Sequence, residues 1–145
     1  MLPSLHDYLL VSYEVLCEAR ELRLRARPNE PGQAGEIIEF VFTGVEGYHF
    51  ENDAFGNIIY HLEEVSPETI LSENAAQLEA GYKQSGWPGP WAGNLATALS
   101  YLQQRGVRGF VLEASFGMSG WVLASNVRAQ QGAQPGRAQT TARAG

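Results

Sequence analysis

Histidines and carboxylates alternate in two short segments of the first half of the chain. His49, Glu51 and Asp53 occupy every second position, and Glu63 follows two positions after His61. In an extended strand, residues i and i+2 lie on the same face of the sheet. Two such pairs on neighbouring strands would bring imidazole and carboxylate groups together. That arrangement is typical of a metal-dependent or hydrolytic enzyme using both histidines.

A charge ladder across strands accounts for some of the same residues without a ligand. Glu39 shares its predicted strand face with a set of alternating cations on the preceding strand, and His61 and Glu63 would continue that side on a fourth strand. The alternating cations are Arg23, Arg25 and Arg27. Opposite charges facing each other across strands contribute about 0.2–1 kcal/mol per pair. We favour the ladder, because a metal site also needs a specific ligand geometry.

The polar segment after the third predicted strand mixes acids with aromatic rings. Aromatic residues on loops are enriched at protein interfaces. Carboxylates pair with Lys and Arg, and ring faces attract cations. We therefore predict an acidic, aromatic binding surface for a basic protein partner. Its residues are Tyr48, Phe50, Glu51, Asp53, Phe55, His61 and Glu63.

The charge distribution supports a basic partner and argues against nucleic acid. The 145 residues carry a formal net charge of -6, with 16 acids against 10 Lys and Arg. No Lys or Arg stands between Arg27 and Lys83, an interval that holds eleven acids. Such a body repels phosphates and would attract a basic protein. No catalytic residue, metal ion or cofactor is assigned from these patterns.

The composition favours a cytoplasmic protein. No run of about 18 apolar residues is present, so we expect no membrane span. Cys17 is the single cysteine and has no partner for an internal disulfide. A reduced compartment is therefore expected.

Alternating hydrophobicity predicts four strands, over residues 8–17, 21–27, 36–45 and 57–65. The inward side chains expected from this alternation are Leu9, Val11, Tyr13 and Val15, then Leu22, Leu24 and Ala26, then Ile38, Phe40 and Phe42, and then Ile58, Tyr60 and Leu62.

Two consecutive helices are predicted next. Ser66 and Pro67 have the residue types of a helix N-terminus, and this helix should stop near Gly86. Asn94 then caps a second helix that ends before Gly106. Two final strands, over residues 107–115 and 120–125, are joined by a tight turn.

The order of elements predicts an α+β fold. We expect an antiparallel β-meander of about six strands with the two helices packed on one face. Residues 1–125 should form a single domain. Residues 126–145 are rich in Gln, Ala, Gly and Thr, which predicts a disordered tail.

Residues 44–60 (GVEGYHFENDAFGNIIY) and 115–124 (SFGMSGWVLA), with Leu5, His6 and Asp7 before them, resemble small bacterial proteins of the toxin-immunity type. The resemblance covers residues 5–125. It implies an α+β fold and a cytosolic binding protein that neutralises a toxin.

Three hypotheses follow from the sequence. The first is a non-enzymatic binding protein of the immunity type that occludes its partner through the acidic, aromatic surface. The alternative is an enzyme that uses His49, His61 and nearby carboxylates. A third is a homo-oligomeric module that associates through an exposed sheet edge.

Overall fold

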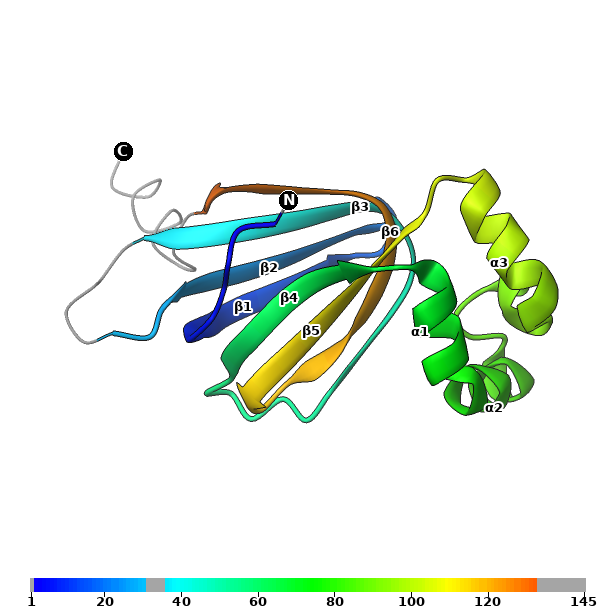
Figure 1. Cartoon of the computed structure of the whole chain (residues 1–145), viewed down its shortest axis with the longest axis horizontal. Helices are drawn as coiled ribbons and strands as arrows, with labels where there is room; N and C mark the ends of the chain where they lie inside the picture. The colour runs from blue at the N-terminus through cyan, green and yellow to red at the C-terminus, as the bar shows by residue number, and fades with distance from the viewer. Residues whose placement is uncertain (1, 31–35, 133–145) are drawn as a thin grey trace.

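The computed structural model describes residues 2–30 and 36–132 (Figure 1). Six strands form a closed antiparallel barrel in the order β1-β2-β3-β6-β5-β4, and the helices gather at one end of it (Figure 1). The strands are β1 (Tyr8–Leu16), β2 (Glu21–Pro28), β3 (Ile37–Glu51), β4 (Ile58–Val65), β5 (Arg108–Phe116) and β6 (Ser119–Gly132). The helices are α1 (Pro67–Glu73), α2 (Ala75–Ser85), the 3₁₀ turn η1 (Pro90–Gly93) and α3 (Leu95–Gln104).

The mixed α+β character is as predicted, but the sheet is a barrel and not a meander. β1, β2 and β3 do follow one another as antiparallel neighbours. β3 then pairs with β6 along nearly its whole length, from Ile37 opposite Gly132 to Glu51 opposite Ser119. β4 therefore lies between β5 and β1, and its pairing with β1 closes the barrel. Alternation specifies which face of a strand is apolar and leaves the choice of partner strand open.

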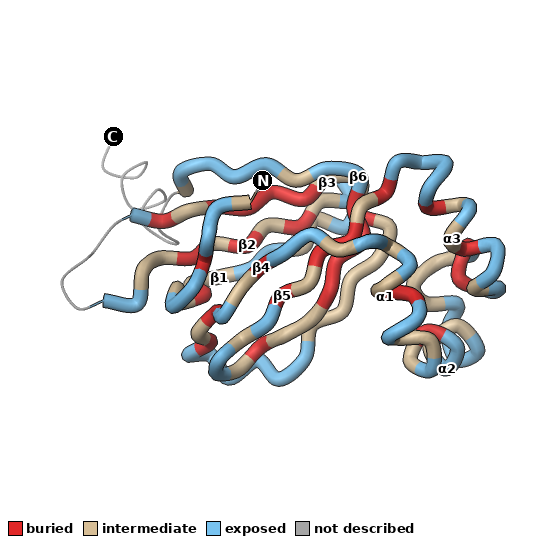
Figure 2. The backbone as a smooth tube through the Cα atoms, viewed as in Figure 1, coloured by how far each residue is buried: buried red, intermediate tan, exposed pale blue. Residues whose placement is uncertain are grey.

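The barrel interior holds the main hydrophobic core. Leu22 and Leu24 of β2 face Phe42 and Phe40 of β3, as the alternation predicts, and all four are fully buried. The Phe42 ring meets the edge of Phe110 from β5 at 5.1 Å between centroids. Figure 2 shows buried positions recurring along the strands. Burial of this apolar surface is the main force that holds the strands together.

Two β-bulges change the predicted inward faces of β1 and β4. In β1 the register shifts between Leu10 and Ser12, and Leu10 is buried in place of its neighbours. In β4 the register shifts around Ile59, which is buried, while Tyr60 is 48% exposed. A bulge inserts one unpaired residue, so the side chains on one side of it exchange faces. The predicted inward position of Tyr60 is therefore wrong.

The helical region contains three α-helices where two were predicted. The first predicted helix is divided at Asn74, whose backbone leaves helical geometry and whose side chain donates to the Ile70 carbonyl at 2.8 Å. Asn94 caps α3 as expected, accepting from two backbone N–H groups. The helices form a second core against the outer face of β6, where Leu78 and Leu102 pack with Trp121.

The ordered domain extends beyond residue 125, where it was predicted to end. β6 continues to Gly132, and Val127 packs against the barrel core. Pairing with β3 supplies the backbone hydrogen bonds that this polar segment could not obtain alone. Residues 133–145 of the predicted tail lie outside the described residues. Within residues 2–30 and 36–132, no helix is long and apolar enough to span a membrane.

Candidate functional site

Four large hydrophobic side chains of the described residues are exposed; three lie in or beside the loop between β3 and β4, and the fourth, Tyr60, lies in the first half of β4. We call them the aromatic rim: Tyr13 (42% exposed), Phe55 (93%), Tyr60 (48%) and Phe116 (58%). Tyr13 and Phe55 line one shallow pocket of about 280 Å³, and Phe116 lies in β5 opposite Ile58 of β4. Single exposed apolar residues are ordinary, but a group of them marks an interaction surface.

The loop that carries Phe55 is held in place by two polar side chains. Asp53 Oδ1 accepts hydrogen bonds from the Phe55 backbone N–H (2.9 Å) and from Asn57 Nδ2 (2.8 Å). Asn57 is buried, and its Oδ1 accepts from the backbone N–H groups of Ala54 and Met118, both at 2.9 Å. Phe55 itself has a φ of 64°, a left-handed conformation that is uncommon for an aromatic residue. The loop thus fixes an exposed ring at a strained backbone position.

Asp53 also joins this loop to β1. Its Oδ2 accepts a hydrogen bond from the Tyr13 hydroxyl at 2.8 Å. The Asn57 amide, the Phe55 N–H and the Tyr13 hydroxyl together lower the pKa of Asp53, because each hydrogen bond favours the carboxylate. The same contact raises the pKa of Tyr13, since a carboxylate acceptor favours the neutral phenol. Asp53 therefore carries its negative charge at neutral pH.

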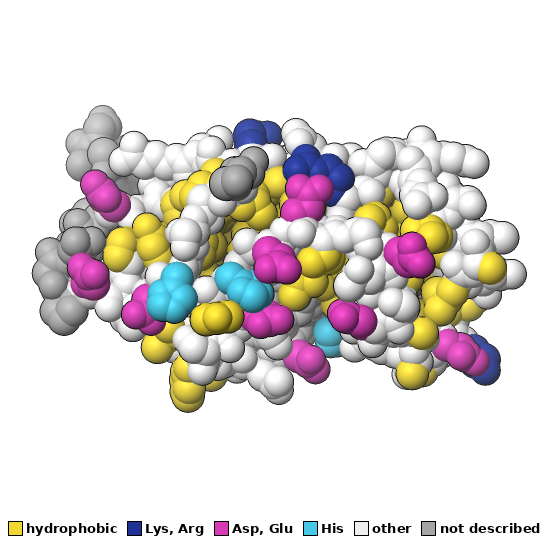
Figure 3. Space-filling model, viewed as in Figure 1, with side chains coloured by type: hydrophobic (Ala, Val, Ile, Leu, Met, Phe, Trp, Pro, Cys, Tyr) yellow, Lys and Arg dark blue, Asp and Glu magenta, His cyan; other side chains and the backbone are white. Residues whose placement is uncertain are grey.

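A second group of polar residues lies on the outer face of β4 and β5. His61 Nε2 is 3.4 Å from a Glu113 oxygen and 3.7 Å from a Glu63 oxygen. The Tyr60 ring lies between the two imidazoles, with centroids 4.9 Å from His61 and 5.6 Å from His6. Figure 3 shows acidic and histidine side chains gathered over this face, with Lys and Arg only toward its edges.

Four carboxylates near the aromatic rim have no Lys or Arg partner among the described residues. We call them the rim acids: Glu51, Asp53, Glu63 and Glu113. Their close polar neighbours are histidines, a tyrosine and amides, which leave their negative charge largely uncompensated. This potential favours a cationic binding partner.

The structure separates the predicted surface residues into two sets. Glu51, Asp53, Phe55 and Glu63 are exposed, whereas Tyr48, Phe50 and His61 are half-buried. Tyr48 and Phe50 pack against the barrel core, with their rings 5.5 Å apart. Phe50 also meets the Tyr13 ring edge-to-face at 6.0 Å, so it packs against one residue of the aromatic rim.

The two predicted histidine pairs do not form one site. His49 lies opposite Trp121 of β6, and Glu63 lies opposite Val111 of β5. Two strands therefore separate the His49 pair from the His61 pair, and the two pairs are not neighbours in the barrel. Across residues 2–30 and 36–132, no three His, Cys, Asp or Glu side chains are arranged to hold a metal ion.

The predicted charge ladder is present on β2 and β3 only. Glu39 is buried, and its oxygens lie 2.7 Å from Arg25 Nε and 3.8 Å from Arg23. Gln130 of β6 also donates to Glu39 at 2.7 Å. The predicted continuation to His61 is wrong, because β6 and not β4 is the next neighbour of β3.

Three members of the aromatic rim were absent from the predicted surface. Tyr13 and Tyr60 were expected inside the sheet, and the bulges in β1 and β4 alter which side chains face outward. Phe116 was expected in a hairpin turn. Its exposure could have been expected from the sequence, because Phe116 stands next to Gly117 in a predicted turn, and turn residues are rarely buried.

Comparison with known proteins gives no match: no family model, no curated protein and no solved structure is similar to this chain.

Proposed function

We propose that this chain is a non-enzymatic binding protein that captures a basic protein through the aromatic rim and the rim acids. The proposal rests on one observation. Three of the four exposed large hydrophobic side chains of the described residues, Tyr13, Phe55 and Phe116, lie in or beside the same loop, which two polar side chains hold fixed. A rigid surface with exposed rings is what a protein interface needs at its energetic centre.

The exposed rings are distributed over several strands, which favours a protein partner over a small-molecule ligand. Tyr13 belongs to β1, Tyr60 to β4 and Phe116 to β5, so the rim spans several elements. Small ligands are usually enclosed in clefts of roughly 300–1,000 Å³. The pocket between Tyr13 and Phe55, of about 280 Å³, is at the lower end of that range, and Phe55 is 93% exposed rather than enclosing a ligand.

The rim acids favour a basic partner. Uncompensated carboxylates accelerate the encounter with a cationic surface, and buried rings slow its dissociation. Capture should therefore begin by electrostatic attraction and be held by apolar contact. The cations on the partner would also meet the ring faces of Tyr60 and Tyr13.

Toxin neutralisation is the more specific form of this proposal. It rests on the resemblance of residues 44–60 and 115–124 to immunity proteins, and these segments contain Phe55, Tyr60 and Phe116. Occlusion of a basic toxin by the rim is the mechanism we propose. The enzyme alternative has weaker support, because His49 and His61 lie on strands that are not neighbours.

Affinity capture from lysate of the source cells tests the proposal. The bait is the full chain, compared with the double variant Phe55→Ala/Phe116→Ser. Gln103→Ala on the exposed side of α3 is the matched control. We expect one stoichiometric basic protein with wild type and control, released as salt rises, and its loss with the double variant. Equal capture by the folded double variant would refute the rim as the binding surface.

A further inference from the structure

The barrel has a seam where two strand edges lack a backbone partner. β1 and β4 pair only through Tyr8 with Ile59 and Leu9 with Ile58. Beyond that point, residues 60–65 of β4 pair with β5 alone, and residues 126–132 of β6 pair with β3 alone. An unpaired edge presents a row of N–H and C=O groups that can accept another strand.

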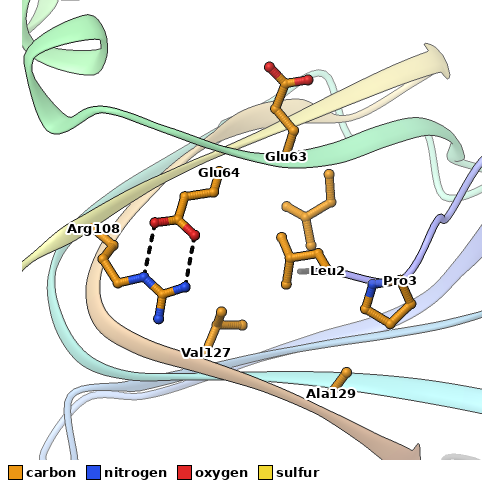
Figure 4. Close-up of a pocket in the computed structure, with 8 residues that line it drawn as sticks. Leu2, Pro3, Glu63, Glu64, Arg108, Val127 and Ala129 are labelled. Carbon is orange, nitrogen blue, oxygen red and sulfur yellow. Dashed lines mark hydrogen bonds and ion pairs between the residues drawn. The ribbon is translucent and has the colours of Figure 1, made fainter.

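Residues between 127 and 131 of β6 line two adjoining pockets. The first, of about 310 Å³, separates β6 from β4 and has a mostly apolar lining that includes Leu2, Leu62 and Val127 (Figure 4). The second, of about 450 Å³, includes Ile37 and Ile38 of β3. Pro3 and Ala129 line both pockets, so the two are neighbours along the strand.

The N-terminal segment crosses the seam without completing the sheet. Leu5 is buried in the barrel core, and Leu2 packs against it. Within the described part of the chain, however, no backbone hydrogen bond joins residues 2–6 to β6. Among residues 2–30 and 36–132, the outer edge of residues 126–132 therefore has no backbone partner.

The charged side chains that line the two pockets are Glu36, Glu63, Glu64 and Arg108, which gives the lining an excess of acids. Arg108 donates two hydrogen bonds to Glu64, at 2.8 and 3.0 Å, and so neutralises it (Figure 4). This contact lowers the pKa of Glu64. Glu63 lines the first pocket and Glu36 lines the second, and neither has a Lys or Arg partner among the residues described.

We propose that an extended segment of a partner polypeptide adds to the free edge of β6 as a further strand. Its backbone would pair with residues 126–132, and apolar side chains at alternate positions would enter the two pockets. Alternate side chains of a strand lie on one face, roughly 6.6–6.8 Å apart. Glu36 and Glu63 select Lys or Arg at the flanks of this segment. The two pockets share no residue with the aromatic rim and share only Glu63 with the rim acids, so this inference goes beyond the proposed function and can fail independently of it.

Solution NMR of the ¹⁵N-labelled full chain tests the proposal. The probe is a short peptide of alternating Val and Thr with Lys at each end, and its control has Pro at the central position. We expect the probe to shift the amide signals of residues 126–132 and slow their hydrogen exchange. Proline removes a donor and disfavours strand pairing, so the control should do neither. Absence of these shifts up to about 5 mM probe, or shifts confined to the aromatic rim, would overturn the proposal.

A pair of variants on neighbouring residues locates the site. Ala129→Phe fills both pockets from the shared wall, whereas Arg128→Phe places the same ring on the outer face of β6. We expect at least about tenfold weaker peptide binding for the first variant and little change for the second. Circular dichroism checks that both fold. Equal binding by both variants, or a homodimer through residues 126–132 in light scattering, would contradict a partner strand at this edge.

Discussion

At the scale of single residues, Asn57 connects the parts of the candidate surface. It is buried, and its side-chain oxygen accepts hydrogen bonds from two backbone N–H groups while its amide nitrogen donates to Asp53. One of the two accepted bonds, from Met118, links the β3–β4 loop to the turn between β5 and β6. Few side chains replace such an amide, because both its donor and its acceptor are used.

Replacement of Asn57 by Ala should therefore destabilise the fold. The variant leaves the Met118 N–H buried without its acceptor, which costs about 1–3 kcal/mol. Urea denaturation followed by circular dichroism measures the change. Gln103→Ala, on the exposed surface of α3, should change the free energy of unfolding by less than about 0.5 kcal/mol. A loss for Asn57→Ala as small as that of the control would contradict this role.

Asp53 should make part of the stability depend on acid pH. Its folded pKa lies below the ordinary value of 3.8, so its contribution is fully present above pH 3.8. The contribution is lost as the pH falls through the lower folded value. We expect Asp53→Asn to flatten the dependence of the melting temperature on pH in this acid range. An unchanged slope in the variant would show that the carboxylate does not act as described.

At the scale of elements, the alternation of residues predicts faces well where strands are regular. Leu22, Leu24 and Phe40 face the core as expected, because β2 and β3 pair without interruption there. Tyr60 does not, because a bulge depends on the partner strand and has no marker in its own sequence. The break at Asn74 is equally local: the surrounding pattern is helical, and one side chain competes for the Ile70 carbonyl.

Substitution by Ala should destabilise the fold at Gly120 and leave its stability nearly unchanged at Gly56. A Cβ at Gly120 would collide with the carbonyl oxygen of His49 on the neighbouring strand, whereas one at Gly56 meets nothing within 4 Å. Gly120→Ala should cost about 1–3 kcal/mol, because the close approach of β3 and β6 cannot relax freely. Gly56→Ala should be close to neutral. Similar melting temperatures for the two variants would contradict the close approach of these strands.

At the scale of the whole molecule, strand pairing decides which predicted residues meet. The acids and Phe55 were identifiable from composition and loop type, since these depend on local sequence. The strand order was not, because the antiparallel pairing of β3 with β6 joins segments about as far apart as the domain allows. Separation of His49 from His61 follows from that pairing, whereas the aromatic rim depends on the pairing of β4 with β1 and β5.

The uncompensated charge of the molecule leads to a prediction about association rate. Reversal of Glu51 and Glu63 to Lys should slow association with the basic partner by about tenfold at low salt, and much less at high salt. Surface plasmon resonance at two ionic strengths measures this. Glu18→Lys, in the turn between β1 and β2, is the control. A slower rate that did not recover with salt would count against electrostatic attraction by the rim acids.

Whether the aromatic rim holds the partner is tested by the dissociation constant of the captured basic protein, measured for wild type and for Phe55→Ala. The ring is 93% exposed, so its removal leaves the core and the loop hydrogen bonds in place. An anchor ring at the centre of an interface contributes about 2 kcal/mol or more, so the constant should rise by at least about thirtyfold. Isothermal titration calorimetry gives both values. An unchanged dissociation constant for the folded variant would show that the aromatic rim does not hold the partner.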